Sequence, residues 1–180
     1  MIARFALATV LALSLARPTV GAELSRSGYA DGMRVLLPLG AAAGSAVAGD
    51  WEGLKQLAFS GAVTVALTEG LKHTVDSERP DRAGNDSFPS GHAATAFAGA
   101  SYVYYRYGWQ WGLPAELAAA GVAWAQVEDR RHHWVDVLAA AGLANLSSFV
   151  YVDGRTPDVI VMPIVGGKKD SFGVLIKLGF

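Results

Sequence analysis

The chain has 180 residues with 15 basic and 16 acidic side chains, a formal net charge of −1, and no cysteine. This length allows one domain with a substantial core. The balanced charge, without a long run of either sign, makes a nucleic acid an unexpected partner, and the absence of cysteine excludes disulfides and thiolate metal sites. Hydrophobic residues make up 52% of the chain and the mean hydropathy is +0.28, a high value for a soluble domain.

The N-terminal segment has the pattern of an export signal. Arg4 precedes an apolar run over residues 5–15, and the small residues Gly21 and Ala22 suit a cleavage site. We therefore predict a signal peptide over residues 1–22. Without cleavage, the same segment would be a membrane anchor. Either alternative exports the chain.

Residues 23–152 predict a mainly α fold, a helical bundle. Pro114 suits the start of a helix and Ser90 suits an N-cap. The charged segment 74–87 predicts a loop, and the polar segment 23–32 predicts irregular structure. Helices are expected over residues 33–49, 53–72, 91–107, 114–127 and 134–152.

The apolar stretches span roughly 13 to 17 residues, which is short against the ~20 that a bilayer core favours. Two alternatives follow: a membrane-embedded bundle, or a periplasmic bundle that is soluble or lies on the membrane. Aromatic residues at 102–111, Trp124 and Trp134 favour the membrane. Residues 153–180 predict a C-terminal β-hairpin, because two β-branched segments flank a glycine- and lysine-containing turn.

Two segments supply groups that suit a phosphate. Lys72 and Arg79, followed by Pro80, offer a point charge and a planar fork. The segment Pro89-Ser90-Gly91-His92 places amide groups at a helix start, where an anion binds, with a histidine beside them. Such a histidine can protonate a leaving oxygen. Alone, each segment is also typical of solvated cations or of an ordinary capping turn.

The third segment pairs His132 with Asp136, and this spacing of four residues puts both on one helix face provided that the helix reaches back to His132. A carboxylate that accepts one imidazole N–H leaves the other nitrogen free as a nucleophile. A helix-surface pair without function has the same spacing. The four histidines lack a tight ligand pattern, so we expect no metal site and no cofactor.

In order and spacing, the three segments resemble the type 2 phosphatidic acid phosphatase superfamily, which includes bacterial acid phosphatases and vanadium haloperoxidases. The family pattern is Lys-x6-Arg-Pro, Pro-Ser-Gly-His and Ser-Arg-x5-His-x3-Asp. The resemblance implies a bundle of that type and a metal-independent phosphatase. It implies that His132 forms a phosphohistidine, that Asp136 orients it, and that His92 acts as general acid and then base. The implied phosphate-binding residues are Lys72, Arg79, Ser90 and Gly91.

One position departs from the family pattern. Ala125 and Gln126 stand where the pattern has Ser-Arg, so a charge that contacts the phosphate is missing. Gln126 can still donate hydrogen bonds. Arg130 and its neighbour Arg131 are candidate substitutes, and our hypothesis is that Arg130 supplies the charge if the fourth helix extends that far.

The expected function is hydrolysis of a lipid phosphate, such as phosphatidic acid, an isoprenoid phosphate or a lipid A phosphate. The expected location is the bacterial cell envelope, with membrane association and a periplasm-facing site. One alternative is a soluble periplasmic acid phosphatase of broad specificity. Another is a degenerate member that binds anionic lipids without turnover, which only Gln126 favours.

Overall fold

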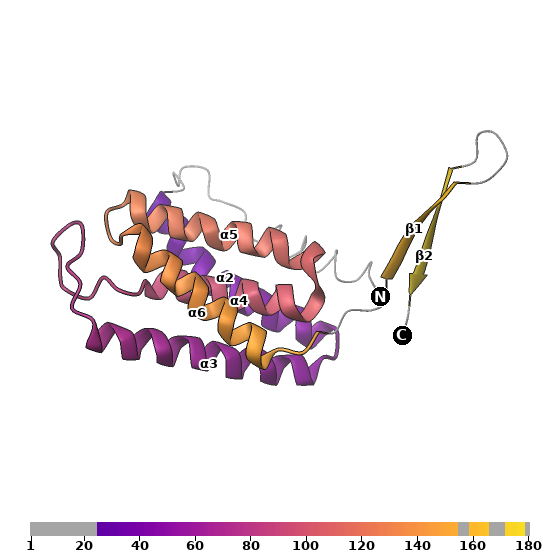
Figure 1. Ribbon diagram of the computed structural model, residues 1–180, viewed down its shortest axis with the longest axis horizontal. Helices are drawn as coiled ribbons and strands as arrows, with labels where there is room; N and C mark the ends of the chain where they lie inside the picture. Colours follow the sequence, from indigo (N-terminus) through magenta and orange to yellow (C-terminus); the bar gives the residue numbers. More distant parts are fainter. Residues whose placement is uncertain (1–24, 155–158, 166–171, 179–180) are drawn as a thin grey trace.

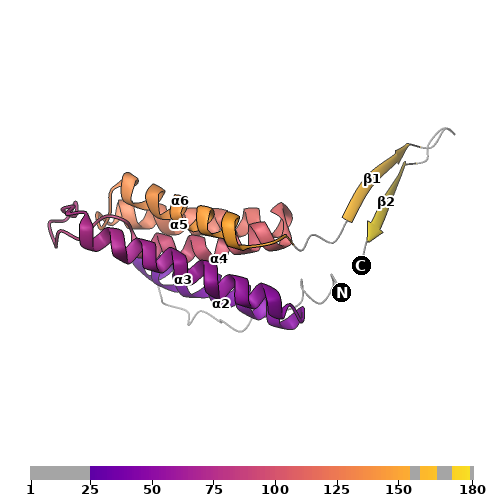
Figure 2. The same cartoon turned by 60° about the horizontal axis from the view of Figure 1, so that its bottom comes forward.

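The computed structural model describes residues 25–154 and the backbone of strands 159–165 and 172–178. Within residues 25–154, helices lie alongside one another in an elongated bundle (Figures 1 and 2). Helix α4 is central and contacts each of the others. The predicted helical bundle is confirmed, whereas the predicted signal peptide lies outside the described residues. The helices are α2 (Arg26–Val47), α3 (Trp51–Thr74), α4 (Gly91–Tyr107), α5 (Trp109–Glu128) and α6 (Trp134–Tyr151).

Two helices, α2 and α5, begin more than one turn earlier than the sequence predicts. The segment expected to be irregular forms the start of α2, where the Ser25 hydroxyl caps the helix by accepting from the Gly28 amide at 3.1 Å. Helix α5 begins at Trp109, so Pro114 lies inside it rather than at its start. The turn before it is made at Gly108, whose φ of 87° suits glycine.

The centre of the bundle is built from small side chains. Its main buried cluster consists largely of alanines, with Phe97 as its one large side chain. Helices α2 and α4 approach each other closely at Gly99, where an added Cβ would lie 2.5 Å from the backbone nitrogen of Pro38. Close packing of this kind places helix backbones near one another in either water or lipid.

Large apolar side chains lie on the outside instead. This arrangement is the reverse of a water-soluble domain, in which such residues fill the core. Among the described residues, α6 is the one helix long and apolar enough to cross a membrane, judged by length and composition. Outward-facing residues at least half exposed include Leu36, Leu39, Trp51, Phe59, Trp109, Leu117, Trp134, Leu138, Leu146 and Phe149.

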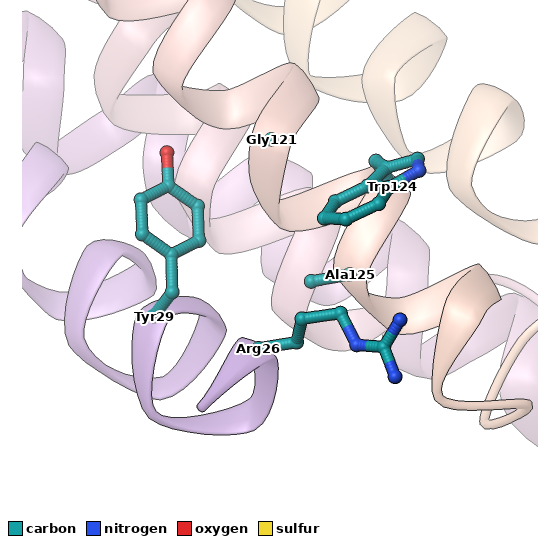
Figure 3. A pocket seen from close by; sticks show the side chains of 5 residues that line it. All are labelled: Arg26, Tyr29, Gly121, Trp124 and Ala125. Carbon is teal, nitrogen blue, oxygen red and sulfur yellow. The ribbon is translucent and has the colours of Figure 1, made fainter. Parts of the chain in front are cut away.

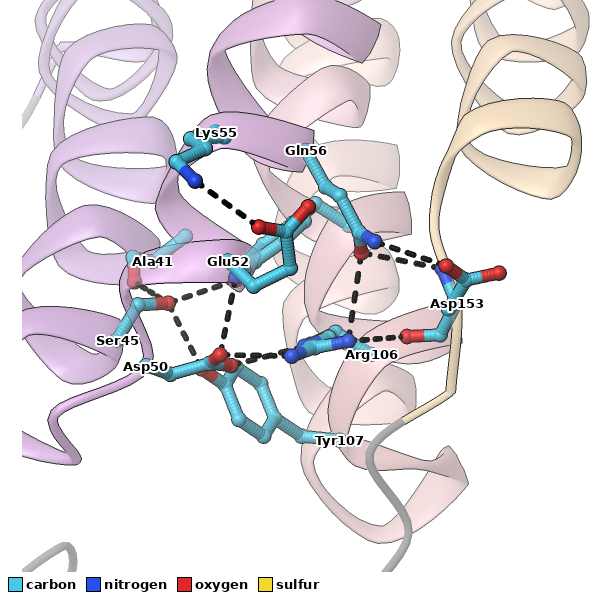
Figure 4. A network of polar contacts seen from close by, with 11 residues as sticks. Ala41, Ser45, Asp50, Glu52, Lys55, Gln56, Arg106, Tyr107 and Asp153 are labelled. Carbon is cyan, nitrogen blue, oxygen red and sulfur yellow. Dashed lines mark hydrogen bonds and ion pairs between the residues drawn. The ribbon is translucent and has the colours of Figure 1, made fainter.

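A buried ion pair fixes the end of the bundle that carries the α2–α3 turn (Figure 4). Arg106 donates to Asp50 through two bonds, Nη2 to Oδ1 at 2.6 Å and Nε to Oδ2 at 2.8 Å, and to the Asp153 carbonyl at 2.7 Å. These bonds hold the pKa of the Asp50 carboxyl well below its ordinary range. They join the α2–α3 turn, the end of α4 and the residues that follow α6.

Beyond the bundle, strands β1 (Val159–Val165) and β2 (Phe172–Leu178) pair antiparallel, with Val165 opposite Phe172. The turn expected between them falls on residues 166–171, outside the described residues. The predicted C-terminal hairpin therefore stays a prediction.

Candidate active site

The three motif segments meet at one end of the bundle, opposite the α2–α3 turn (Figure 1). The long loop between α3 and α4 brings them together because it closes on itself. The Ser77 amide donates to the Asn85 carbonyl at 3.0 Å, and the Ser87 amide donates to the Ser77 carbonyl at 2.9 Å. Between these two contacts, the Arg79 amide donates to the Gly84 carbonyl at 2.8 Å.

Asp86 organises the two predicted cations. Its carboxylate accepts two bonds from Arg79, Nε to Oδ1 at 2.7 Å and Nη2 to Oδ2 at 3.0 Å. Its carbonyl accepts from Lys72 Nζ at 2.8 Å, and Lys72 also donates to the Pro89 carbonyl at 2.9 Å. The hydrogen bonds from Arg79 lower the pKa of the Asp86 carboxyl. The sequence analysis did not predict a role for Asp86. The available signal was that an acidic residue lies in the same loop as Arg79.

His132 is buried, with its ring in a defined protonation state. Its Nδ1 lies 2.7 Å from the Ser87 carbonyl oxygen, which can only accept, so Nδ1 carries the proton. Burial lowers the pKa of His132 to about 4, and the bond to Ser87 offsets only part of this shift. The imidazole is therefore neutral at neutral pH, with a lone pair on Nε2 that can act as a nucleophile.

Asp136 contacts this histidine less directly than predicted. Its Oδ2 lies 3.7 Å from His132 Nδ1, beyond hydrogen-bonding range. The same oxygen accepts hydrogen bonds from the Ser87 hydroxyl at 2.5 Å and from the His133 amide at 2.7 Å. The bond to the His133 amide also caps α6. The expected direct bond is replaced because Ser87 lies between the two: its hydroxyl contacts Asp136 and its carbonyl contacts His132. Ser87 was not predicted, because a lone serine in a polar loop carries no distinguishing signal.

The Pro-Ser-Gly-His segment forms the start of α4. Ser90 is its N-cap, as predicted, and accepts from the Ala93 amide at 3.4 Å. The Ser90 amide donates to the Asp136 carbonyl at 3.1 Å, which ties this segment to α6. His92 contacts a residue that the sequence did not indicate: its Nε2 lies 2.8 Å from Oδ1 of Asp31, in α2. Asp31 fell in the segment predicted to be irregular.

Gln126 lies beneath the site, 2% exposed, with a side-chain oxygen that has no hydrogen-bond partner among the described residues. Its carbonyl accepts from the amides of Arg131 and His132, at 3.0 and 3.2 Å. Helix α5 ends at Glu128, and Arg130 lies beyond it, exposed, with a left-handed φ of 56°. The helix extension on which the hypothesis about Arg130 depended is therefore absent. The charge of Arg131 contributes to lowering the pKa of His92.

An apolar pocket of about 340 Å³ opens between α2 and α5 (Figure 3). Arg26 lies at its edge, with its guanidinium carbon 6.0 Å from the centre of the Trp124 ring and its Nε 3.2 Å from Asp129. Tyr29 closes one side and donates to the Ala118 carbonyl at 2.9 Å. Ala125, one of the residues that line the pocket, directly precedes Gln126 in α5. Among the described residues, the site included, no group of three or more histidine and carboxylate side chains is arranged to hold a metal ion.

Comparison with known proteins decides the family. Residues 53–156 match the family model of the PAP2 superfamily. The chain belongs to the PAP2 superfamily. The matched range contains every motif residue from Lys72 to Asp136, so the resemblance drawn from the sequence is confirmed. Helix α2, with Asp31, lies outside it.

Two relatives extend this comparison. The chain is 33% identical over 121 residues to the lipid A 4'-phosphatase of Helicobacter pylori (strain J99 / ATCC 700824), a match that covers 59% of this chain and 61% of that protein. The chain thus spans about three fifths of the length of that relative. The crystal structure of Aquifex aeolicus LpxE has the same fold, with a TM-score of 0.61, 20% identity, and coverage of 71% of this chain and 82% of that one.

Proposed function

We propose that this PAP2 protein is a metal-independent phosphatase that removes a phosphate group from a lipid, with His132 as its nucleophile. The observation that carries the proposal is the state of His132. It is buried and neutral, and Ser87 holds its Nδ1–H, so that Nε2 has a free lone pair. Lys72 and Arg79, in the same end of the bundle, supply the positive charge that a phosphate requires.

The first proposed step transfers the phosphoryl group to the protein. His132 Nε2 attacks phosphorus, the bond from phosphorus to the lipid oxygen breaks, and His92 gives its proton to that oxygen. The lipid alcohol leaves and a phosphohistidine remains. Lys72, Arg79 and the amides at the start of α4 stabilise the charge on the phosphoryl oxygens.

The second proposed step restores the enzyme. His92, now neutral, takes a proton from water as the water oxygen attacks phosphorus and the bond to His132 breaks. Inorganic phosphate leaves, and His92 is again protonated. Asp136 contributes through Ser87. It accepts a hydrogen bond from the Ser87 hydroxyl, and the Ser87 carbonyl in turn orients the His132 ring.

The outer surface of the bundle supports a membrane location. Large apolar side chains cover it, and exposed tryptophans lie towards both ends: Trp124 and Trp134 near the site, Trp51 and Trp109 near the other. Tryptophans in two such groups are typical of a bundle that meets two membrane surfaces. We propose that the site lies at one surface, which the expected export signal makes periplasmic. The relative that acts on lipid A makes a phosphorylated glycolipid the first substrate to test.

The test is phosphate release by purified protein in detergent from lipid A, phosphatidic acid, an isoprenoid phosphate and the soluble p-nitrophenyl phosphate. We expect release from at least one lipid, lost in His132→Ala and kept in His73→Ala, a matched change at an exposed histidine. Preference for the soluble ester would instead favour a broad-specificity acid phosphatase. Lipid binding without His132-dependent release would show a degenerate member.

A further inference from the structure

The proposed phosphoryl transfer assigns no role to the contact between Asp31 and His92. Asp31 Oδ1 lies 2.8 Å from Nε2 of His92. Asp31 belongs to α2, outside the residues that match the family, and the two residues are 61 positions apart in the chain. The His92 side chain is 22% exposed and that of Asp31 is 55% exposed, so the pair lies at the rim of the site.

We propose that Asp31 is a positioning residue for His92, which accepts the Nε2–H and thereby fixes which ring nitrogen handles the transferred proton. This proposal rests on the proposed phosphatase function. With Nε2–H bound to Asp31, the group that gives the proton to the leaving oxygen is Nδ1–H. After that transfer the neutral ring keeps its bond to Asp31, and the Nδ1 lone pair then takes the proton from water.

The position of Asp31 is set by packing on both sides of the first turns of α2. Ala30, the preceding residue, is fully buried in the main core cluster. Tyr29 donates to the Ala118 carbonyl in α5 at 2.9 Å, and the Ser25 cap fixes the start of the helix. A carboxylate mounted on such a helix holds its partner more precisely than one on a loop.

The charge of Asp31 matters because two cations lie near His92. Arg34 of α2 and Arg131 of the α5–α6 turn both act electrostatically on the ring. Arg34 also approaches Asp31, with Nε 3.7 Å from the oxygen that contacts His92. Guanidinium groups disfavour a protonated imidazole and a carboxylate favours it. Burial lowers the pKa of His92, and the contact with Asp31 offsets part of this shift in the presence of the two arginines.

The test compares Asp31→Asn, which keeps the size of the side chain and an acceptor oxygen but removes its charge, with wild type. We expect kcat to fall about threefold to tenfold with KM changed less than twofold, and the loss of activity at high pH to begin about one pH unit lower. Arg34→Gln, which removes a neighbouring cation, should move the high-pH loss of activity to a higher pH. Glu52→Gln, the same chemical change at an exposed carboxylate, should change neither parameter.

A second readout does not need turnover. In protein labelled with ¹⁵N-histidine, the titration midpoint of His92, assigned with His92→Gln, should be lower in Asp31→Asn than in wild type. A wild-type kcat in Asp31→Asn together with an unchanged His92 midpoint would overturn the proposal. So would a fall in kcat that accompanies a loss of thermal stability while the high-pH loss of activity stays at the same pH. Absence of His132-dependent turnover in wild type would refute the proposed function alone, because the NMR titration still reports on the pair.

Discussion

Removal of the Ser87 hydroxyl should slow the reaction while leaving the bundle folded. The hydroxyl donates to Asp136 Oδ2 at 2.5 Å, and both residues are fully buried. A hydrogen bond to a charged acceptor contributes about 1.5–3 kcal/mol. If this loss appears in the barrier, kcat falls about 10- to 150-fold. Since Asp136 keeps its bond from the His133 amide, and the carbonyl at position 87 remains for His132, we expect Ser87→Ala in the lower part of that range.

The assay is the steady-state kinetics of phosphate release in Ser87→Ala, with thermal unfolding of the same preparation. KM should change little, because the hydroxyl contacts Asp136 rather than a phosphate-binding cation. Ser101→Ala is the matched control: Ser101 is equally buried, and its hydroxyl donates to Glu116 Oε1 at 2.9 Å, away from the motif residues. A kcat within twofold of wild type, or an equal loss in Ser101→Ala, would refute the idea that Asp136 acts through Ser87.

Two other predictions concern buried ionisable groups. Because the pKa of His132 is lowered to about 4, activity on the acid side should fall only as the pH drops through about 4. The acid side of the log(kcat/KM) profile, corrected for the titration of the substrate phosphate, should therefore show no break at the ordinary histidine pKa of about 6.5. Arg106→Ala should destabilise the bundle by about 3–5 kcal/mol, since it removes the cation that pairs with the buried Asp50 carboxylate. In thermal unfolding, Lys55→Ala, which removes an exposed ion pair near the same turn (Figure 4), should have almost no effect.

The parts of the site that could be predicted are those specified by short spacing. The cap at Ser90 depends only on where helix α4 begins. The helix face expected to carry both His132 and Asp136 is not formed, because α6 begins at Trp134 and His132 precedes its N-cap. The seven-residue step from Lys72 to Arg79 depends only on the family pattern. The contacts among these groups could not be predicted, because they depend on the path of the 75–90 loop. That path puts the Ser87 carbonyl, rather than Asp136, on the His132 ring.

The extent of α2 was underestimated for a related reason. Its first turns are polar and contain two glycines, so local propensity argues against a helix. They are helical because Ala30 is buried and Tyr29 bonds to α5, which are contacts with residues far away in the sequence. The contact between Asp31 and His92 was missed as a consequence, because a segment assumed to be irregular has no defined face.

The glutamine at position 126 changes the charge balance on which phosphate binding depends. Lys72 and Arg79 supply two positive charges at the motif end, and Asp86 and Asp136 supply two negative ones, so these four groups sum to zero. An arginine at position 126 would add a positive charge within α5, whereas Gln126 adds none. The charge needed to hold a phosphate therefore has to come from outside that helix. We propose two groups as its source: Arg79, when its carboxylate partner Asp86 gives way to the phosphate oxygens, and Arg131, whose charge lowers the pKa of His92.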